Sequence, residues 1–291
     1  MNVLVCGARG FIGRATCDAL RRRGHRVMAA SSSAAGIDTV TVDFARDTDA
    51  ATWRPRLVGM DAIVNVVGVL RDSARRPIVA AHQRVPEALF EACAQAGVRR
   101  VVHVSALGIA GSATLYARTK IAAENALQAR AGRLDGVVVR PSIVFGRGGA
   151  SSELFISLAR LPVLLLPEAV RRTRVQPVAV AELAEAIARL VDTPESATRE
   201  LDAVGPEPIA LGDFIASLRA QAGRAPARVG TLPGALARWS ARAGDVLPVS
   251  PWCSETLSLL GADNIAEPGP FEHVLGRRAT RFDTLLQGAN R

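Results

Sequence analysis

The sequence has few aromatic residues: eight Phe, three Trp and one Tyr among 291 residues. Proteins that bind single-stranded nucleic acid stack bases on aromatic side chains, and no stacking motif is present here. The net charge of +9 comes from arginines dispersed along the chain. Their densest run, Arg21–Arg23, closes a predicted helix, where cations complement the dipole. We therefore expect no nucleic-acid partner, although the charge permits weak association with an anionic membrane surface.

Cysteines and long apolar runs are also scarce. The four cysteines have neither metal-ligand nor disulfide spacing, so we interpret them as reduced packing residues and expect no metal site; they are Cys6, Cys17, Cys93 and Cys253. The most apolar run, Leu161–Val170, is far shorter than the roughly 20 residues that span a bilayer. Met1 leads directly into a predicted strand and leaves no room for a signal peptide. These features favour a cytoplasmic protein without a transmembrane span.

Lysine is the scarcest charged residue. Among the 36 Lys and Arg residues the single lysine is Lys120, and it lies four residues after the only tyrosine, Tyr116. Residues i and i+4 share one face of a helix, so a phenol would lie beside an ammonium. A free phenol titrates near 10, and a neighbouring cation lowers that pKa toward the range of a general acid or base. The alternative is a surface tyrosine packed on a lysine stem.

A glycine-rich turn follows the first predicted strand. The apolar run Asn2–Cys6 leads to Gly7, Gly10 and Gly13, and a helical pattern then continues to Gly24. This strand, turn and helix are typical of a dinucleotide site, in which the glycines let the backbone turn tightly and approach a diphosphate at the helix N-terminus. A second strand is predicted over 26–30.

The end of that second strand indicates which dinucleotide is preferred. An acidic residue there would bind an unphosphorylated ribose, but the chain has serine at positions 31–33. Arg9 lies immediately before the second glycine, where it could reach a 2′-phosphate, and the serine hydroxyls could add hydrogen bonds. We favour NADP(H). If Arg9 is only a solvated turn residue, NAD(H) is equally possible.

Further strands alternate with helices and deliver candidate site residues. Strands are predicted over 39–42, 62–67, 101–104 and 136–140, and helices over 80–96 and from Tyr116 to Gln128. Asp43 and Phe44 would border the adenine, and Gly68 would leave space for the cofactor. Ser105 would either polarise a substrate carbonyl or hydroxyl or cap a helix.

This alternation predicts an α/β protein with a doubly wound parallel (Rossmann) sheet. We expect residues 1–145 and about 176–200 to form it, and about 146–175 and 201–291 to form a smaller C-terminal substrate lobe, broken by prolines. In that lobe Leu232, Leu236 and Trp239, with Arg238 and Arg242, suggest an amphipathic helix. Packing against the sheet is the default interpretation, and a membrane-surface or partner-binding face is the alternative.

The motifs together resemble the extended and atypical branch of the short-chain dehydrogenase/reductase superfamily. The resemblance rests on the three spaced glycines, on Asp43-Phe44, on the Tyr116/Lys120 pair and on Arg140-Pro141 before Gly146. Within the branch, the chain is most similar to the nucleotide-binding accessory subunit of respiratory complex I and its bacterial relatives, through the segments 65–70, 103–105, 140–146, 176–178 and 263–276.

The resemblance implies a nicotinamide cofactor. Tyr116 would be the acid/base, and Lys120 would bind the nicotinamide ribose and lower the pKa of the phenol. Sugar-nucleotide enzymes of this branch carry a second hydroxyl residue just after Ser105, whereas this chain has Ala106 and Leu107, which puts that chemistry in doubt. Arg174 corresponds to a phosphate-binding position; a salt bridge between the lobes is the alternative.

Two functions remain open. The first, which we favour, is an NADP(H)-dependent oxidoreductase or epimerase-type enzyme acting on a small molecule. The second is a catalytically silent NADPH-binding structural, assembly or redox-sensing protein. Substrate and oligomeric state do not follow from the sequence. The proposed catalytic residues are Tyr116, Lys120 and Ser105, and the proposed cofactor-binding residues are Gly7, Arg9, Gly10, Phe11, Ile12, Gly13, Ser31, Ser32, Asp43, Phe44, Val67, Gly68, Lys120, Pro141 and Val144.

Overall fold

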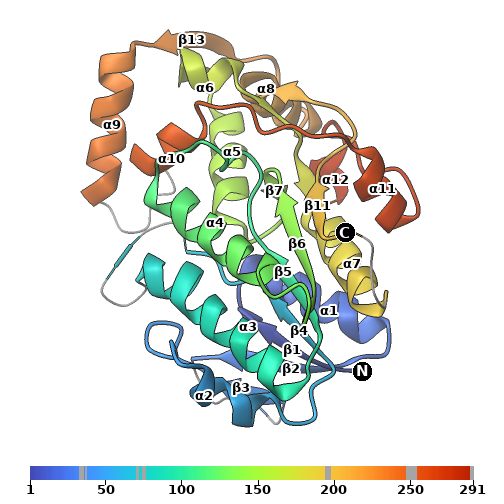
Figure 1. The fold of residues 1–291 in the computed structure, drawn as a ribbon. Coiled ribbons are helices and arrows are strands. Elements are labelled where there is room, and N and C mark those ends of the chain that lie inside the picture. The colour runs from blue at the N-terminus through green and yellow to red at the C-terminus, as the bar shows by residue number, and fades with distance from the viewer. Residues whose placement is uncertain are drawn as a thin grey trace. The chain divides into compact units, whose positions relative to one another are not determined.

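The structure, a computed structural model, describes residues 1–32, 36, 38–69, 72–73, 77–193, 198–246 and 254–288 (Figure 1). The chain divides into two compact units. The first contains Met1–Pro141 and Ala181–Leu201, and the second contains Ser142–Val180 and Asp202–Arg291. The divisions therefore fall after residues 141, 180 and 201, where the sequence suggested 145, about 175 and about 200.

The first unit is built around a seven-stranded sheet with the order β11-β6-β5-β4-β1-β2-β3. The five neighbouring pairs from β6 to β3 are all parallel. This confirms the doubly wound sheet, to which β11 adds an edge strand. The strands are β1 (Asn2–Cys6), β2 (Arg26–Ser31), β3 (Thr39–Thr41), β4 (Ala62–Asn65), β5 (Arg100–Val104), β6 (Asp135–Pro141) and β11 (Glu200–Ala203).

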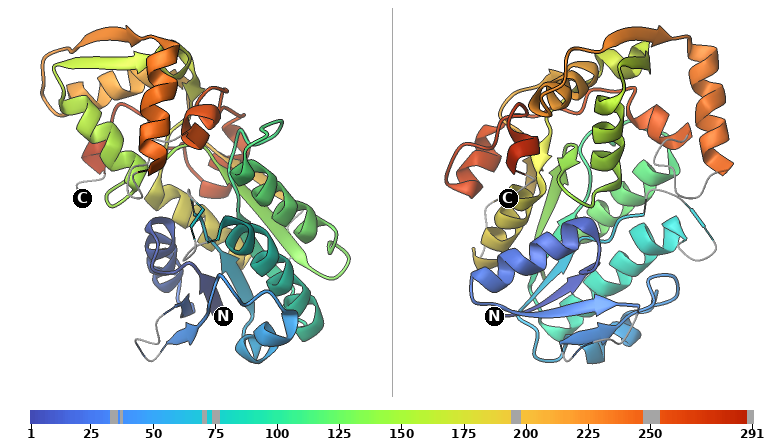
Figure 2. Two further views of the ribbon diagram at one scale, coloured as in Figure 1. Left: turned by 90° about the vertical axis from the view of Figure 1, so that its left-hand side faces the viewer. Right: turned by 180° about the vertical axis from the view of Figure 1, so that it is seen from behind.

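Helices cover both faces of this sheet, with α3 and α4 on one side and α1 and α7 on the other (Figure 2). Because both faces are covered, the central strands are continuous apolar runs; residues 3–6 of β1 are fully buried. The helical elements are α1 (Phe11–Arg22), α2 (Ala50–Trp53), η1 (Arg54–Leu57), η2 (Ala80–Arg84), α3 (Val85–Ala96), α4 (Leu115–Gln128) and α7 (Val180–Asp192).

The helix expected over 80–96 does not begin as a regular α-helix. Its first turn, η2, is a wide π-helical turn, and α3 starts only at Val85. Pro86 explains the difference: it has no N–H to donate, and its ring would clash with a carbonyl one turn earlier in a regular α-helix. Such wide turns occur frequently at functional sites.

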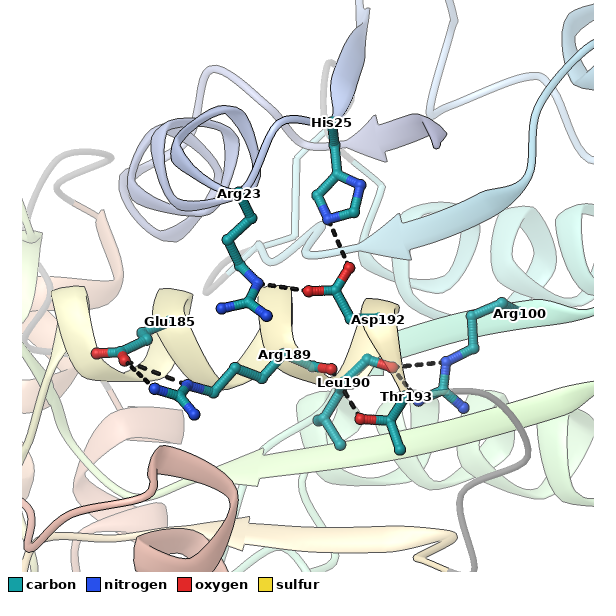
Figure 3. Close-up of polar contacts among 8 residues, drawn as sticks. All are labelled: Arg23, His25, Arg100, Glu185, Arg189, Leu190, Asp192 and Thr193. Atoms are coloured by element: carbon teal, nitrogen blue, oxygen red, sulfur yellow. Dashed lines mark hydrogen bonds and ion pairs between the residues drawn. The ribbon is translucent and has the colours of Figure 1, made fainter.

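Within the first unit, polar contacts tie the end of α7 to the segment between α1 and β2 and to β5 (Figure 3). Asp192 lies 2.5 Å from Arg23 Nε and 2.8 Å from His25 Nε2. The buried Arg100 donates from Nε to Leu190 O at 2.7 Å and pairs with Asp135 at 2.8 Å. Burial lowers the pKa of the Arg100 guanidinium, although the Asp135 carboxylate opposes that shift. These contacts hold the returning helix against the strands from which the site is built.

The second unit consists of short helices and two-stranded ladders. A buried cluster at its centre includes Phe145, Phe155 and Phe214, whose rings pack edge to face. Its strands are β7 (Val144–Phe145), β8 (Val163–Pro167), β9 (Arg174–Val175), β10 (Val178–Ala179), β12 (Ile209–Ala210) and β13 (Arg228–Leu232). Its helices are α5 (Ala150–Arg160), α6 (Glu168–Arg172), α8 (Leu211–Gln221), α9 (Gly234–Val246), α10 (Ser254–Leu259), α11 (Gly269–Leu275) and α12 (Leu285–Gly288).

The structure corrects part of the expectation of an amphipathic helix around 232–242. Leu232 ends β13 and Pro233 separates that strand from α9. Leu236 and Trp239 lie on α9 but are 57% and 75% exposed, so the default expectation that they pack inward is wrong. No helix among the described residues is long and apolar enough to cross a membrane.

Candidate functional site

The glycine turn lies at the carboxyl end of β1, beside the point where the strand order reverses between β1 and β4. Gly7 has φ +86°, and a Cβ there would come within 3.1 Å of Val67 N. A Cβ on Gly13 would lie 2.0 Å from Gly7 O, far inside contact distance. Gly10 N donates to Gly7 O at 2.9 Å. The turn therefore requires glycine for φ at Gly7 and for close backbone approach at Gly13.

The N-terminus of α1 is open to an anion. Its N-cap is Gly10, which has no side chain to occupy the first amide groups, and its first turn contains no acidic residue. Arg14 Nη1 donates to Arg9 O at 2.7 Å and stabilises the turn. Free amide groups at the positive end of a helix fit a diphosphate, so these residues suit a dinucleotide. Phe11 and Ile12, in the same turn, are half-buried.

The residues expected near the adenosine lie on neighbouring strand ends. Ser31 is buried at the end of β2, Ser32 is exposed and Arg9 is exposed, while Ser33 lies outside the described residues. Asp43 serves its own loop, since its carboxylate accepts from Ala45 N at 2.9 Å. Phe44 packs against Trp53, with ring centroids 6.5 Å apart.

Lys120 connects two strand ends beneath the site. Its Nζ donates to Val67 O after β4 and to Val104 O at the end of β5, both at 3.0 Å. The residue is only 2% exposed. Burial lowers the pKa of this ammonium to about 8, while the Glu124 carboxylate acts in the opposite direction. One N–H donor is left after these two bonds, because an ammonium carries three.

Tyr116 lies one turn before Lys120 on α4 and is half-buried. Thr114 is the N-cap of this helix and accepts from Ala117 N at 3.2 Å. The phenol ring packs edge to face against His82, with ring centroids 5.3 Å apart. Tyr116 and Lys120 thus lie on one capped helix, and Tyr116 also contacts the ring of His82.

His82 is a site residue that the sequence analysis missed. Its Nε2 accepts from Val69 N at 2.8 Å, and its Nδ1 lies 3.4 Å from Thr119 Oγ1. Burial, with Lys120 and His103 nearby, lowers the pKa of His82 to about 2, so its ring is neutral. The neutral imidazole connects the loop after β4 to α4 next to Tyr116. The only signal in the sequence is Pro86, which accounts for the π-helical turn that carries His82.

His103, also missed, forms a second buried pair. Its Nδ1 lies 3.1 Å from Asn65 Nδ2, and Asn65 Oδ1 accepts from Val67 N at 3.2 Å. Burial, followed by the charge of Lys120, lowers the pKa of His103 well below its usual range. If Asn65 donates to Nδ1, the proton lies on Nε2. The pair therefore supports the same backbone segment whose carbonyl holds Lys120.

Ser105 follows β5 and is 4% exposed. Its Oγ has no hydrogen-bond partner among the described residues. The helix-cap alternative is wrong, because Thr114 caps the next helix. A buried hydroxyl without a partner is costly unless another group uses it.

Two arginines that the sequence analysis singled out form ion pairs within the protein. Arg140, just before Pro141, pairs with Glu124 at 2.5 Å and Glu200 at 2.6 Å. Arg174 pairs with Asp263 at 2.6 Å, a bridge within the second unit and not between the lobes. Asp263 has a lowered pKa through its hydrogen bonds with Arg174. Val144 belongs to the second unit.

Comparison with known proteins identifies the class. Residues 3–201 match the model of the NAD dependent epimerase/dehydratase family, and the chain belongs to that family. This confirms the resemblance noted in the sequence and the NAD(P)-dependent class of the fold.

Particular relatives show the range within the class. The chain is 24% identical over 265 residues to rat mitochondrial NADH dehydrogenase [ubiquinone] 1 alpha subcomplex subunit 9, covering 86% of this chain and 69% of that protein. Human epimerase family protein SDR39U1, solved with NADPH, has a TM-score of 0.75 at 20% identity and full coverage of both chains. The NADPH-dependent quinone oxidoreductase QOR2 of Escherichia coli has a TM-score of 0.76 at 15% identity, also with full coverage of both chains.

Proposed function

We propose that the protein is an NADP(H)-dependent enzyme of the oxidoreductase or epimerase type, in which Tyr116 transfers the proton. The observation that carries this proposal is the buried Lys120, which is fixed by two backbone carbonyls one helical turn from Tyr116. With a pKa of about 8, it is mostly protonated at neutral pH. A cation beside a phenol favours the phenolate, which suits Tyr116 for acid/base work.

The nicotinamide cofactor would supply or accept a hydride when bound. The glycine turn would hold its diphosphate, and the third donor of Lys120 would bind its ribose. Ser105 would donate its unused hydrogen bond to a substrate oxygen. Phe11, Ile12, Phe44, Val67, Gly68, Pro141 and Val144 would line the cofactor, Asp43 would border the adenine, and Arg174 would have to leave Asp263 to reach a substrate phosphate.

We base the preference for NADP(H) on two features: serine, not a carboxylate, at the end of β2, and the exposed Arg9 after β1, the strand that pairs with β2. Changing Arg9→Ala should weaken NADPH binding about tenfold and leave NADH binding within twofold, because only NADPH carries the 2′-phosphate. Nicotinamide fluorescence titrations measure both. Equal weakening of the two nucleotides would show that Arg9 does not read the phosphate.

A catalytically silent, NADPH-retaining assembly or redox-sensing protein is the second candidate. The missing second hydroxyl at Ala106 and Leu107 favours it, as does similarity to a named subunit of a larger complex.

We also propose a cytoplasmic location. Cys6, Cys17 and Cys93 are buried and free, as in a protein that stays reduced.

The variant Tyr116→Phe separates the two candidates. In an enzyme it should lower turnover of carbonyl or quinone substrates by about 10²-fold to 10⁴-fold, since the acid/base group is lost. NADPH affinity and melting temperature should stay unchanged. A variant that turns over like the wild type would contradict the catalytic role and leave the silent candidate standing.

A further inference from the structure

Among the described residues, the large apolar side chains left exposed are concentrated in one part of the second unit. Leu161 is 46% exposed, Val163 51% and Leu165 55%. These three alternate along and just before β8, so they share its outer face, while Leu164 and Leu166 are buried. A Cβ on Gly230 of β13 would lie 2.7 Å from Leu165, so Leu165 lies across the paired strand.

Helix α9 extends this apolar surface. Leu236 and Trp239 are three residues apart, and therefore share one face of the helix. Ala241 and Gly244, on the opposite side, are buried. Strand β13 and α9 are adjacent in all views of the second unit (Figures 1 and 2), and α9 also contacts β8. We call Leu161, Val163, Leu165, Leu236 and Trp239 the β8–α9 surface.

Basic residues outnumber acidic ones around the β8–α9 surface, where Asp245 near the end of α9 and Glu168 directly after β8 are the nearest carboxylates in the sequence. No Asp or Glu occurs from residue 214 to 244, a stretch that contains Arg219, Arg224, Arg228, Arg238 and Arg242. Arg224, Arg228 and Arg242 are exposed, as is Arg160 before β8. Within the ranges that the structure describes, no carboxylate pairs with these four.

Several arginines elsewhere in the protein do pair with carboxylates. Arg23, Arg56, Arg140 and Arg174 each pair with a carboxylate within 3 Å. An exposed tryptophan, an apolar strand face and unpaired arginines form the composition that binds an anionic lipid interface, where indole lies at the headgroup level and each cation gains from the surface potential.

We propose that the β8–α9 surface docks the protein on the surface of an anionic lipid bilayer, without spanning it. The apolar side chains would enter the headgroup region and the arginines would contact lipid phosphates. This inference is independent of the proposed enzyme, whose glycine turn, Tyr116 and Lys120 belong to the first unit.

Binding of the full-length protein to vesicles tests the proposal. The protein should sediment with vesicles made of phosphatidylcholine and phosphatidylglycerol in equal parts, much less with phosphatidylcholine alone, and less at high salt. Trp239→Glu should lower the partition coefficient at least about tenfold, because it removes an apolar anchor and adds a negative charge that the anionic lipids repel. Arg242→Gln should lower it roughly fivefold.

Val58→Glu is the matched control. Val58 is also an exposed apolar residue, at 78%, but lies in the first unit, so the same charge change there should leave vesicle binding within twofold. Trp239→Phe should bind almost like the wild type while losing the blue shift of tryptophan fluorescence that vesicles produce. Melting temperatures verify that every variant is folded.

Three results would overturn the proposal. They are failure of the wild type to bind anionic vesicles, equal loss in Val58→Glu and Trp239→Glu, and a dimer in lipid-free solution that Trp239→Glu dissociates. The last would make the surface a contact between two copies of the chain. Retention of NADPH binding by Trp239→Glu keeps this test separate from that of the proposed enzyme.

Discussion

The two units depart from the usual distribution of polar and apolar groups in opposite ways. In the first unit, Lys120, His82 and His103 are almost completely buried. In the second, Leu165 and Trp239 are largely exposed. Either departure costs stability, since buried polar groups lose water and exposed apolar groups order it. Such costs are retained where function uses them, and they are the basis on which we propose chemistry in the first unit and contact with a lipid surface in the second.

A substitution in the glycine turn of the first unit should have the strongest effect. Gly13→Ala would put a methyl group 2.0 Å from Gly7 O, so the backbone must shift. We expect a loss of about 3 kcal/mol in the free energy of unfolding and no measurable nucleotide binding. Urea denaturation and fluorescence titration measure the two effects.

Gly132→Ala is the control for this change, because a Cβ at Gly132 meets nothing within 4 Å. It should leave nucleotide binding unchanged. Similar binding by Gly13→Ala and the wild type would show that the turn tolerates a side chain and does not hold the diphosphate.

The next effect concerns the cost of burying Lys120. Its pKa is about 8 in the folded protein and about 10.4 in an unfolded chain. Between these values the unfolded chain binds more protons, so rising pH increases the stability contributed by this group. The variant Lys120→Met has no ammonium at this position, so its stability lacks this increase with pH. The stability of the wild type relative to the variant should therefore increase by about 2 kcal/mol from about pH 7 to about pH 9.5.

Urea denaturation of both proteins at the two pH values measures this difference, and taking the difference cancels the opposite contribution of the buried cysteines. Burial raises the pKa of Cys6 to about 12 and that of Cys17 to about 11, so the contribution of these thiols to the free energy of unfolding falls as pH rises. A difference that does not change with pH would mean that Lys120 is not buried as an ammonium.

The smallest expected effect concerns His82 as a positioning residue. His82→Phe leaves Val69 N without its acceptor and changes the packing against Tyr116. We expect kcat to fall about tenfold with little change in KM, and His82→Gln, which keeps an acceptor, to recover part of it. His273→Phe, at an exposed histidine of the second unit, should change neither constant. A rise in KM alone would contradict the positioning role.

Local patterns predicted where the glycine turn lies and that Tyr116 and Lys120 share one helix, because each depends on neighbouring residues and on the geometry of one turn or helix. His82 and His103 could not be predicted, since their environment forms only when η2, β5 and α4 pack together. The exposure of Trp239 was equally inaccessible: an amphipathic pattern says that one helix face is apolar, but only the tertiary structure decides whether that face is covered.

Titration of the wild-type protein with NADPH and NADH, followed by nicotinamide fluorescence, shows whether the carboxyl edge of the first sheet binds a nicotinamide dinucleotide beside Tyr116 and Lys120. We expect saturable binding, tighter for NADPH, that Gly13→Ala abolishes and Gly132→Ala retains. If the wild type binds neither nucleotide, the proposed site does not exist.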